Sequence, residues 1–271
     1  MLAATFYFAI MNVGIKALSH LPVMEIVFFR CGVSLLLSAA VVYREGVDWK
    51  GSNRKLLILR GMFGTVALTT YFITIANMSL GTAVTIQYLS PIFTTILAIF
   101  VLGEKVKPLQ WLFFIISFSG VLVMKGYDSN IDTKYLLIGL FSAITSAFAY
   151  NTIRTLKDKE HPAVVVLHFQ LIGTMAGGLF SIGNFEMPEG YDWLWIIVIG
   201  VFTQLGQMAM TRALQQEQVA NVSIINYTGV VYALIFGSLF FGEIYPVSTI
   251  AGILLVVSGV ALSIIYRSRL R

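Results

Sequence analysis

The chain has 271 residues, of which 58% are hydrophobic and only 11% are charged. A soluble domain usually carries about 25% charged residues, so composition argues strongly against a water-soluble globular enzyme. The net charge of +5 does not indicate nucleic-acid binding, because the basic residues border apolar segments instead of forming one face. The single cysteine, Cys31, cannot form an intramolecular disulfide, and no Cys/His pair has metal-ligand spacing. We therefore expect no metal and no cofactor.

Ten apolar segments, bounded by Gly, Pro, Asn and charged residues, predict ten membrane-spanning helices. Residues 61–103 alone include 43 positions without a charge, which is enough for two crossings. Because the bilayer core offers no water to an open backbone, each crossing must be helical. The first segment has no basic leader and no cleavage site, so we expect it to be retained. The predicted spans are residues 2–18, 24–43, 56–77, 82–102, 109–124, 135–154, 163–182, 193–213, 219–241 and 248–266.

The distribution of basic residues between loops predicts the orientation of the chain. With the N-terminus in the cytoplasm, thirteen basic residues fall on the inner side and three, Lys16, Lys125 and Lys134, on the outer side. Arg30 and Arg60 lie within spans and are left out of this count. The imbalance predicts a multi-pass protein of the cytoplasmic (inner) membrane with both termini in the cytoplasm.

The second half of the chain repeats features of the first half at an offset of about 139 residues. Because five spans per half is an odd number, the two halves must have opposite orientations in the membrane. We expect an all-α integral membrane protein built from two inverted five-helix repeats, residues 1–127 and 128–271. At an offset of 138, Lys16 aligns with Arg154 and Arg30 with His168. At 139, the matches are Gly61-Met62-Phe63 with Gly200-Val201-Phe202, Gln87-Tyr88 with Asn226-Tyr227, Gly103-Glu104 with Gly242-Glu243, and Ser119-Gly120-Val121 with Ser258-Gly259-Val260.

Inverted repeats of this kind are typical of secondary transporters. Two similar halves of opposite orientation can adopt two related tilts, so a site between them opens first to one side and then to the other. The architecture therefore predicts solute transport.

Several short motifs resemble those of the drug/metabolite transporter superfamily, specifically its ten-helix EamA-type members. The resemblance covers nearly the whole chain and implies transport of small organic metabolites such as amino acids, nucleosides, nucleotide-linked compounds or aromatic toxicants. Residues 227–229 and 243–246 also resemble the branch that contains S-adenosylmethionine carriers. Pro91 is matched by Val230, so a helix break is expected in the first half only. The motifs are Gln87-Tyr88-Leu89-Ser90-Pro91, Leu102-Gly103-Glu104 and Ser119-Gly120, then Tyr227, Phe241-Gly242-Glu243 and Ser258-Gly259.

Polar residues inside the predicted spans are the candidates for contact with a solute, because a polar group in the bilayer costs free energy unless it is paired or hydrated. Their alternative role is hydrogen bonding between helices. Arg30 could hold a carboxylate or phosphate, or could extend outward to Glu25 or to lipid phosphate. His168 could titrate near neutral pH, or could rest at the membrane interface. We predict a substrate-binding set of Gln87, Tyr88, Asn226, Tyr227, Arg30, His168, Asn12, Tyr71, Tyr150 and Gln207, with Gln204 nearby and Pro91 as a hinge.

Other charged residues are expected to have structural roles at the ends of the spans. We expect Lys16 to pair with Glu25 at the rim, where such a pair contributes little to stability. Glu104 and Glu243 are expected to cap the helices that follow them. Gly61 and Gly64, with Gly200 and Gly206, are expected to permit close helix packing.

The interiors of the spans hold no Asp or Glu, which disfavours a proton relay through a carboxylate at the membrane centre. Exchange of solutes or downhill passage stays open. The alternatives to a carrier are an intramembrane enzyme, for which paired acids or a nucleophile beside a base are missing, and a channel-like pore, for which a continuous polar stripe is missing. The expected partners are a small-molecule substrate and the lipid bilayer, without nucleic acid, and a homodimer stays open.

Overall fold

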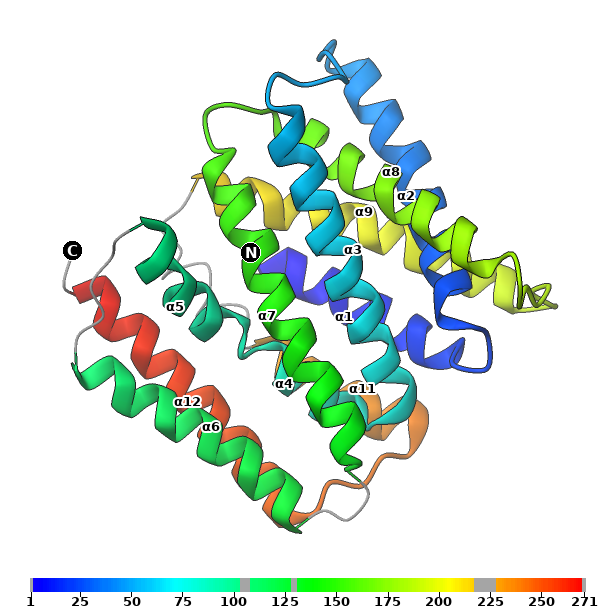
Figure 1. The fold of residues 1–271 in the computed structure, drawn as a ribbon. Helices are drawn as coiled ribbons and strands as arrows, with labels where there is room; N and C mark the ends of the chain where they lie inside the picture. Colours follow the sequence, from blue (N-terminus) through cyan, green and yellow to red (C-terminus); the bar gives the residue numbers. More distant parts are fainter. Residues whose placement is uncertain (1, 103–107, 128–130, 217–227, 270–271) are drawn as a thin grey trace.

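A computed structural model describes residues 2–102, 108–127, 131–216 and 228–269 of the chain. Every regular element within these ranges is a helix, as expected for an all-α membrane protein (Figure 1). In the described ranges, eight segments are long and apolar enough to cross a membrane, and α1 and α11 are shorter apolar helices. The helices are α1 (Leu2–Ala17), α2 (Val23–Arg44), α3 (Arg54–Asn77), α4 (Leu80–Gln87), α5 (Ser90–Leu102), α6 (Pro108–Tyr127), α7 (Thr133–Thr155), α8 (Pro162–Ser181), α9 (Asp192–Gln216), α11 (Thr228–Phe241) and α12 (Val247–Arg269).

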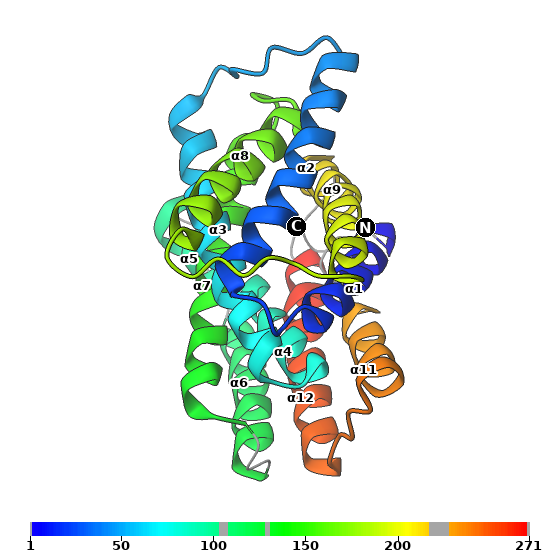
Figure 2. The same ribbon diagram turned by 90° about the vertical axis from the view of Figure 1, so that its right-hand side faces the viewer.

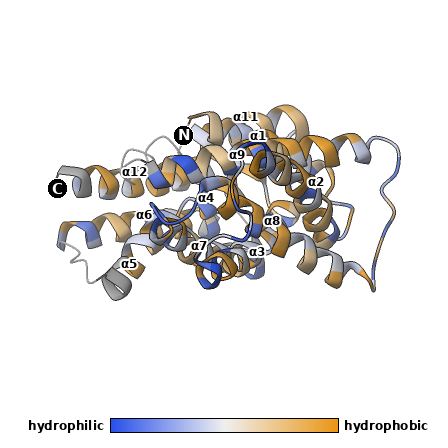
Figure 3. Cartoon of the chain, turned by 90° about the horizontal axis from the view of Figure 1, so that it is seen from above, coloured by the Kyte–Doolittle hydropathy of each residue, from blue (hydrophilic) through white to orange (hydrophobic). Residues whose placement is uncertain are grey.

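The outer faces of the helices are strongly apolar. Leu36 of α2, Leu122 of α6 and Leu239 of α11 are 74%, 70% and 71% exposed. Hydrophobic residues run along most of the helical length (Figure 3). Exposing an apolar surface this extensive to water is energetically unfavourable, so these faces are the surface that contacts lipid. The chain is therefore a multi-pass membrane protein.

The fourth predicted span is interrupted, and Pro91 explains where. α4 ends at Gln87 and α5 begins at Ser90. Proline has no N–H to donate to the carbonyl four residues earlier, and its ring clashes with that carbonyl, which here belongs to Gln87. Tighter turns replace the α-helical bonds, with Leu89 N donating to the Ile86 carbonyl at 3.0 Å. The expected break is therefore present in the first half.

The second half can be compared only in part, because residues 217–227 lie outside the described residues. α11 begins at Thr228, one residue before the position equivalent to Ser90 at the 139-residue offset, and Val230 lies within it. The segment directly before α11, in which a helix break of the second half would lie, is outside the described residues.

The helices pack in a pattern that stays the same when the two halves are exchanged. In the repeat, α1, α2 and α3 correspond to α7, α8 and α9. Accordingly, the contact of α1 with α9 is matched by that of α7 with α3, and the contact of α2 with α9 is matched by that of α8 with α3. Two further pairs, α2 with α8 and α6 with α12, bridge the halves directly. The α6–α12 pair forms one end of the molecule and the α2–α8 pair forms the other end (Figures 1 and 2). This exchange is what two inverted repeats require.

Individual contacts repeat at the same 139-residue offset. Gly61 packs against Ile172, and its counterpart Gly200 packs against Val33, the counterpart of Ile172. Because both residues of one contact lie 139 positions from their counterparts in the other, the pairs α2 and α8, and α3 and α9, align at the same offset. The register of 139, and not 138, is therefore the structural one for these helices.

The α6–α12 pair shows the same exchange in its backbone contacts. A Cβ at Gly120 would lie 2.5 Å from the Gly252 carbonyl oxygen, and a Cβ at Gly259 would lie 2.7 Å from the Phe113 carbonyl oxygen. Gly252 and Phe113 are themselves counterparts at the 139-residue offset. The two backbones thus touch at equivalent points, where only glycine fits.

We expect Gly259→Val to destabilise the protein, because the backbone of α6 cannot move aside for the new side chain. Overpacking of this kind costs about 1–3 kcal/mol. The measurement is thermal unfolding of the purified protein in detergent, where the midpoint should fall by several degrees. Ser258→Val is the control, since Ser258 is an exposed neighbour on the same helix turn. Equal midpoints for the two variants would contradict the close approach.

Candidate solute-binding cavity

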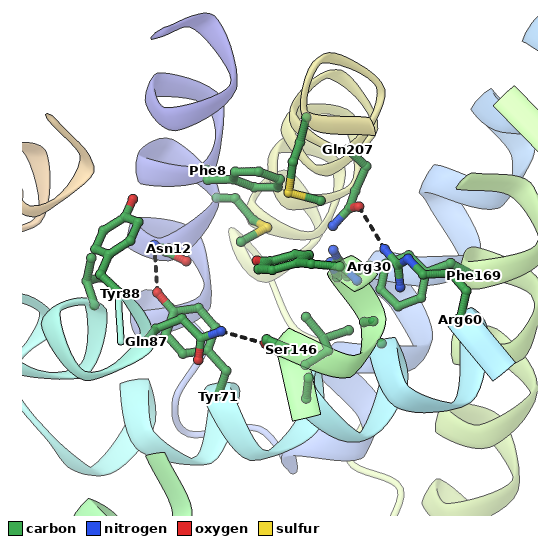
Figure 4. A pocket seen from close by; sticks show the side chains of 18 residues that line it. Phe8, Asn12, Arg30, Arg60, Tyr71, Gln87, Tyr88, Ser146, Phe169 and Gln207 are labelled. Atoms are coloured by element: carbon green, nitrogen blue, oxygen red, sulfur yellow. Dashed lines mark hydrogen bonds between the residues drawn. The ribbon is translucent and has the colours of Figure 1, made fainter. Parts of the chain in front are cut away.

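A cavity of about 130 Å³ lies between the two halves of the chain. Its walls come from α1, α2, α3 and α4 of the first half and from α7, α8 and α9 of the second (Figure 4). Of the ten predicted binding residues, eight lie in the described part of the chain. Seven of these line the cavity: Asn12, Arg30, Tyr71, Gln87, Tyr88, Tyr150 and Gln207. Their role in binding a solute remains a prediction.

Three predicted residues stand apart from this set. Asn226 and Tyr227 lie outside the described residues. His168 is not among the lining residues, and its Nδ1 lies 3.0 Å from the Val164 carbonyl oxygen of its own helix. At the structural offset of 139, the counterpart of Arg30 is Phe169, which does line the cavity. One residue along a helix turns a side chain by about 100°, so the offset of 138 identified the neighbour of the lining residue.

Gln87 is held firmly against α7. Its Nε2 donates to Ser146 Oγ at 2.7 Å, and its Oε1 accepts from Ser142 Oγ at 2.9 Å. Both ends of the amide are therefore used between helices, which was the alternative role considered from the sequence. One N–H of the amide group remains for a solute, and the serines fix its direction.

Hydroxyl and amide groups also connect α1 to α3. Asn12 Nδ2 donates to the Tyr71 hydroxyl at 3.1 Å, while Asn12 Oδ1 is buried and has no hydrogen-bond partner among the described residues. Tyr88 follows the last residue of α4 and lines the same end of the cavity (Figure 4). This end therefore offers neutral donors and acceptors beside aromatic rings.

The other end of the cavity is cationic. Arg30 is 1% exposed, and its Nε donates to Thr203 Oγ1 of α9 at 2.9 Å. In the described chain it forms no ion pair with Glu25. The guanidinium carbon lies 5.5 Å from the centre of the Phe169 ring. Arg30 therefore points into the protein, and the outward alternative is wrong.

Arg60 lines the cavity beside Arg30, and we did not predict it. It is 2% exposed, and its guanidinium carbon stands 4.3 Å from the centre of the same Phe169 ring. The sequence did contain a signal, because a charge inside a predicted span is a functional candidate by default. Ser146 and Phe169 were also missed, and neither residue type is unusual in a membrane helix.

One contact group joins both halves beyond the neutral end of the cavity. Lys16 of α1 forms an ion pair with Glu243 at 3.0 Å and donates to the Met78 carbonyl. The Glu243 carboxylate also accepts from the backbone N–H of Leu80, the first residue of α4, at 2.8 Å. Tyr245 donates to Glu243 at 2.5 Å, and its burial raises the pKa of the phenol further above neutrality, so it stays a donor. We call Lys16, Glu243, Tyr245 and Leu80 the rim cluster.

The rim cluster corrects two sequence-based expectations. Lys16 pairs with Glu243 instead of Glu25, whose carboxylate accepts from the Glu186 backbone N–H at 2.9 Å. Glu243 caps α4, a helix far away in sequence, instead of the helix that follows it. A carboxylate at a helix N-terminus is stabilised by unpaired N–H groups and by the helix dipole. Glu104 lies outside the described residues.

Comparison with known proteins gives the same architecture. The model of the EamA-like transporter family matches residues 1–125 and again residues 133–265. One solved crystal structure superposes with a TM-score of 0.70 at 18% identity, covering 99% of this chain and 97% of that one. This likeness shows the fold.

Two relatives are similar over nearly the whole chain. The chain is 32% identical over 264 residues to the pseudopaline exporter CntI of Pseudomonas aeruginosa, covering 96% of this chain and 93% of that protein. It is 31% identical over 275 residues to human solute carrier family 35 member G1, covering 95% and 75%. A third, more distant relative is the S-adenosylmethionine uptake transporter of Rickettsia prowazekii, 24% identical over 257 residues and covering 93% and 85%.

The inverted repeat, the cavity between its halves and these matches define a membrane transporter. The chain belongs to the EamA-like transporter family. The resemblance to the drug/metabolite transporters is thereby confirmed, as is the expectation of a transporter instead of an enzyme.

We expect Glu243→Gln to destabilise the protein more than Glu45→Gln. Glu243 and Lys16 are 11% and 17% exposed, so loss of the carboxylate leaves a largely buried ammonium without its counter-charge, at a cost of about 1–3 kcal/mol. Glu45 pairs with Arg212 in a more exposed position, where an ion pair contributes about 0–1 kcal/mol. Thermal unfolding in detergent measures both variants. Similar midpoints would show that the rim cluster does not hold the halves together.

Proposed function

We propose that this protein is a secondary transporter that moves a small amphipathic or zwitterionic organic metabolite across the cytoplasmic membrane. The observation that carries the proposal is the position of the cavity, between two halves whose packing is unchanged by their exchange. A site in that position can face either side of the membrane as the halves rock. We take residues 1–127 and 128–271 as these halves.

The relatives support the class of activity and leave the direction of transport open. One is named as an exporter of pseudopaline and another as an uptake transporter of S-adenosylmethionine. Amino acids, nucleosides and S-adenosylmethionine-like compounds are therefore the first solutes to screen. Export, uptake and exchange all fit one alternating-access cycle.

The proposed orientation places both termini in the cytoplasm, because thirteen loop basic residues then lie inside and three outside. In that orientation the rim cluster lies on the outer side, where α1 ends and α4 begins. We infer that the contacts of the rim cluster hold this side of the protein together in the described conformation. Opening to that side requires Glu243 to release Lys16 and the start of α4.

Pro91 supplies a place for the necessary movement. The interruption between α4 and α5 lets the short helix α4 tilt without bending the helix that follows it. We propose that Pro91 acts as the hinge of the first half.

Transport tests the proposed binding residues. A thermal-shift screen with the solutes named above identifies a ligand, and uptake of that ligand into liposomes containing the purified protein is then measured. Gln87→Ala and Tyr227→Ala should each lower uptake at least tenfold without loss of folding. Gln170→Ala is the control, since Gln170 is fully buried in α8 but does not line the cavity. Undiminished uptake in both variants would overturn the predicted set of binding residues.

Cross-linking of the rim cluster tests the alternating cycle. In a Lys16→Cys/Glu243→Cys variant, a short bifunctional methanethiosulfonate joins the two thiols through disulfide bonds. The reagent should stop uptake because the joined rim cannot open, and a dithiol reductant, which cleaves these disulfides, should restore it. Cys31 is buried, so it does not compete for the reagent. The variants with only one of the two substitutions, treated with the same reagent, are the controls. Full uptake by the cross-linked double variant would contradict the proposed movement.

A further inference from the structure

Two positive charges in the cavity have no negative partner among the residues that the structure describes. Arg30 and Arg60 are both at least 98% buried. Within the described part of the chain, neither guanidinium forms an ion pair, and no Asp or Glu lines the cavity. Two like charges in an apolar interior are costly unless an opposite charge arrives. The protein itself does not supply that charge among its described residues.

Arg60 has hydrogen-bonding capacity to spare. Its Nη2 reaches Gln207 Oε1 only at 3.4 Å, and its Nε and Nη1 are buried without a hydrogen-bond partner in the described residues. Buried donors are normally satisfied, so unsatisfied ones at a cavity wall point to a ligand.

The local sequence provides the space that the Arg60 guanidinium needs. Gly64 lies one helical turn after Arg60, and a Cβ at this position would overlap Nη1. The guanidinium therefore folds over Gly64 and stands against Phe169, instead of extending along α3 to the membrane surface. Its position inside the protein is built into the helix.

The two ends of the cavity carry different polar groups. The guanidinium groups and Phe169 form one end, and Asn12, Tyr71 and Tyr88 form the other (Figure 4). Asn12 Oδ1 is buried and has no partner within the described ranges, so the neutral end can accept a hydrogen bond from a solute. Cavities of about 150 Å³ admit a benzene ring, and this one is about 130 Å³. The volume is thus close to that of one ring, and the two ends of the cavity offer different polar groups to whatever part of a solute lies there.

We propose that the cavity binds an organic anion, with its carboxylate between Arg30 and Arg60 and a hydroxyl or amino donor at Asn12. This proposal rests on the proposed transport function and specifies the charge of the solute. Guanidinium groups match the geometry and charge of a carboxylate. A cationic end group would meet two like charges and no acid in the described wall. The ring or chain of the solute lies against Phe169 and the neighbouring aromatic side chains.

Three probes of the same size and different charge test the proposal. They are 4-hydroxyphenylacetate, its neutral amide and tyramine, whose end group is an ammonium. Thermal unfolding of the purified full chain in detergent is measured with each. The acid should bind at least about tenfold more tightly than the amide, and tyramine should not stabilise the protein. Equal or stronger stabilisation by the amide or by tyramine would overturn the assignment.

Substitution of Arg60 separates a binding role from a structural one. Arg60→Met removes an uncompensated buried charge, so without ligand it should unfold a few degrees higher than the natural protein, and it should lose the response to the acid. Arg60→Lys keeps the charge and should retain a weakened response. Arg212→Met, at an exposed ion pair, is the control that keeps the response. A lower midpoint for Arg60→Met without ligand, or an undiminished response, would show that Arg60 is a packing residue.

Uptake into liposomes distinguishes this proposal from the proposed function. Arg60-dependent binding of the acid without its uptake would support the anion site and contradict transport of this probe class. Uptake of tyramine without binding of the acid would contradict the anion site and support a transporter of another specificity.

Discussion

The two halves of this protein are held together by helices that approach each other backbone to backbone. Inside a bilayer the hydrophobic effect does not drive helices together, so close van der Waals contact must do so. Gly120 and Gly259 supply that contact between the backbones of α6 and α12, and Gly61 and Gly200 let the side chains of Ile172 and Val33 pack directly on α3 and α9. Because each contact occurs twice, once in each half, the halves are bound by matching interfaces. The position of the cavity between them follows from this packing.

The buried charges that line the cavity lower the stability of the folded protein. Two guanidinium groups, both contributed by the first half, stand over one phenylalanine of the second half. The alignment of Arg30 with Phe169 shows how the repeat has diverged at the site while its packing glycines still match. A symmetrical scaffold can thus carry an asymmetrical binding surface, as binding of an asymmetrical molecule requires.

The fold could be predicted from the sequence because its determinants are local or periodic. Long apolar segments gave the helices, the 139-residue offset gave the repeat, and Pro91 gave the interruption after Gln87. Intramembrane polarity identified seven of the residues that line the cavity, Asn12, Tyr71 and Gln207 among them, because a polar group inside a membrane span is a candidate for contact with a solute. The partners of these residues were less accessible, because they depend on distances between helices.

The misplaced predictions have the same cause. Pairing Lys16 with Glu25 assumed that nearby charges in the sequence meet, whereas the partner lies 227 positions away, in the turn before α12. A one-residue error in the repeat offset replaced Phe169 with His168, since a repeat detected from short matches does not determine which side of a helix faces inward. Arg60 carries the same sequence signal as Arg30, a charge inside an apolar span, and was not predicted.

The short helix α4 has a mechanical consequence. Its eight residues form a rod about 12 Å long, with Leu80 bonded to Glu243 at one end and Gln87 and Tyr88 at the cavity at the other. The break before Pro91 separates this rod from the rest of its span. We therefore expect a molecule that displaces Tyr88 to shift the far end of the rod as well, which couples the occupancy of the cavity to the rim cluster without any intervening loop.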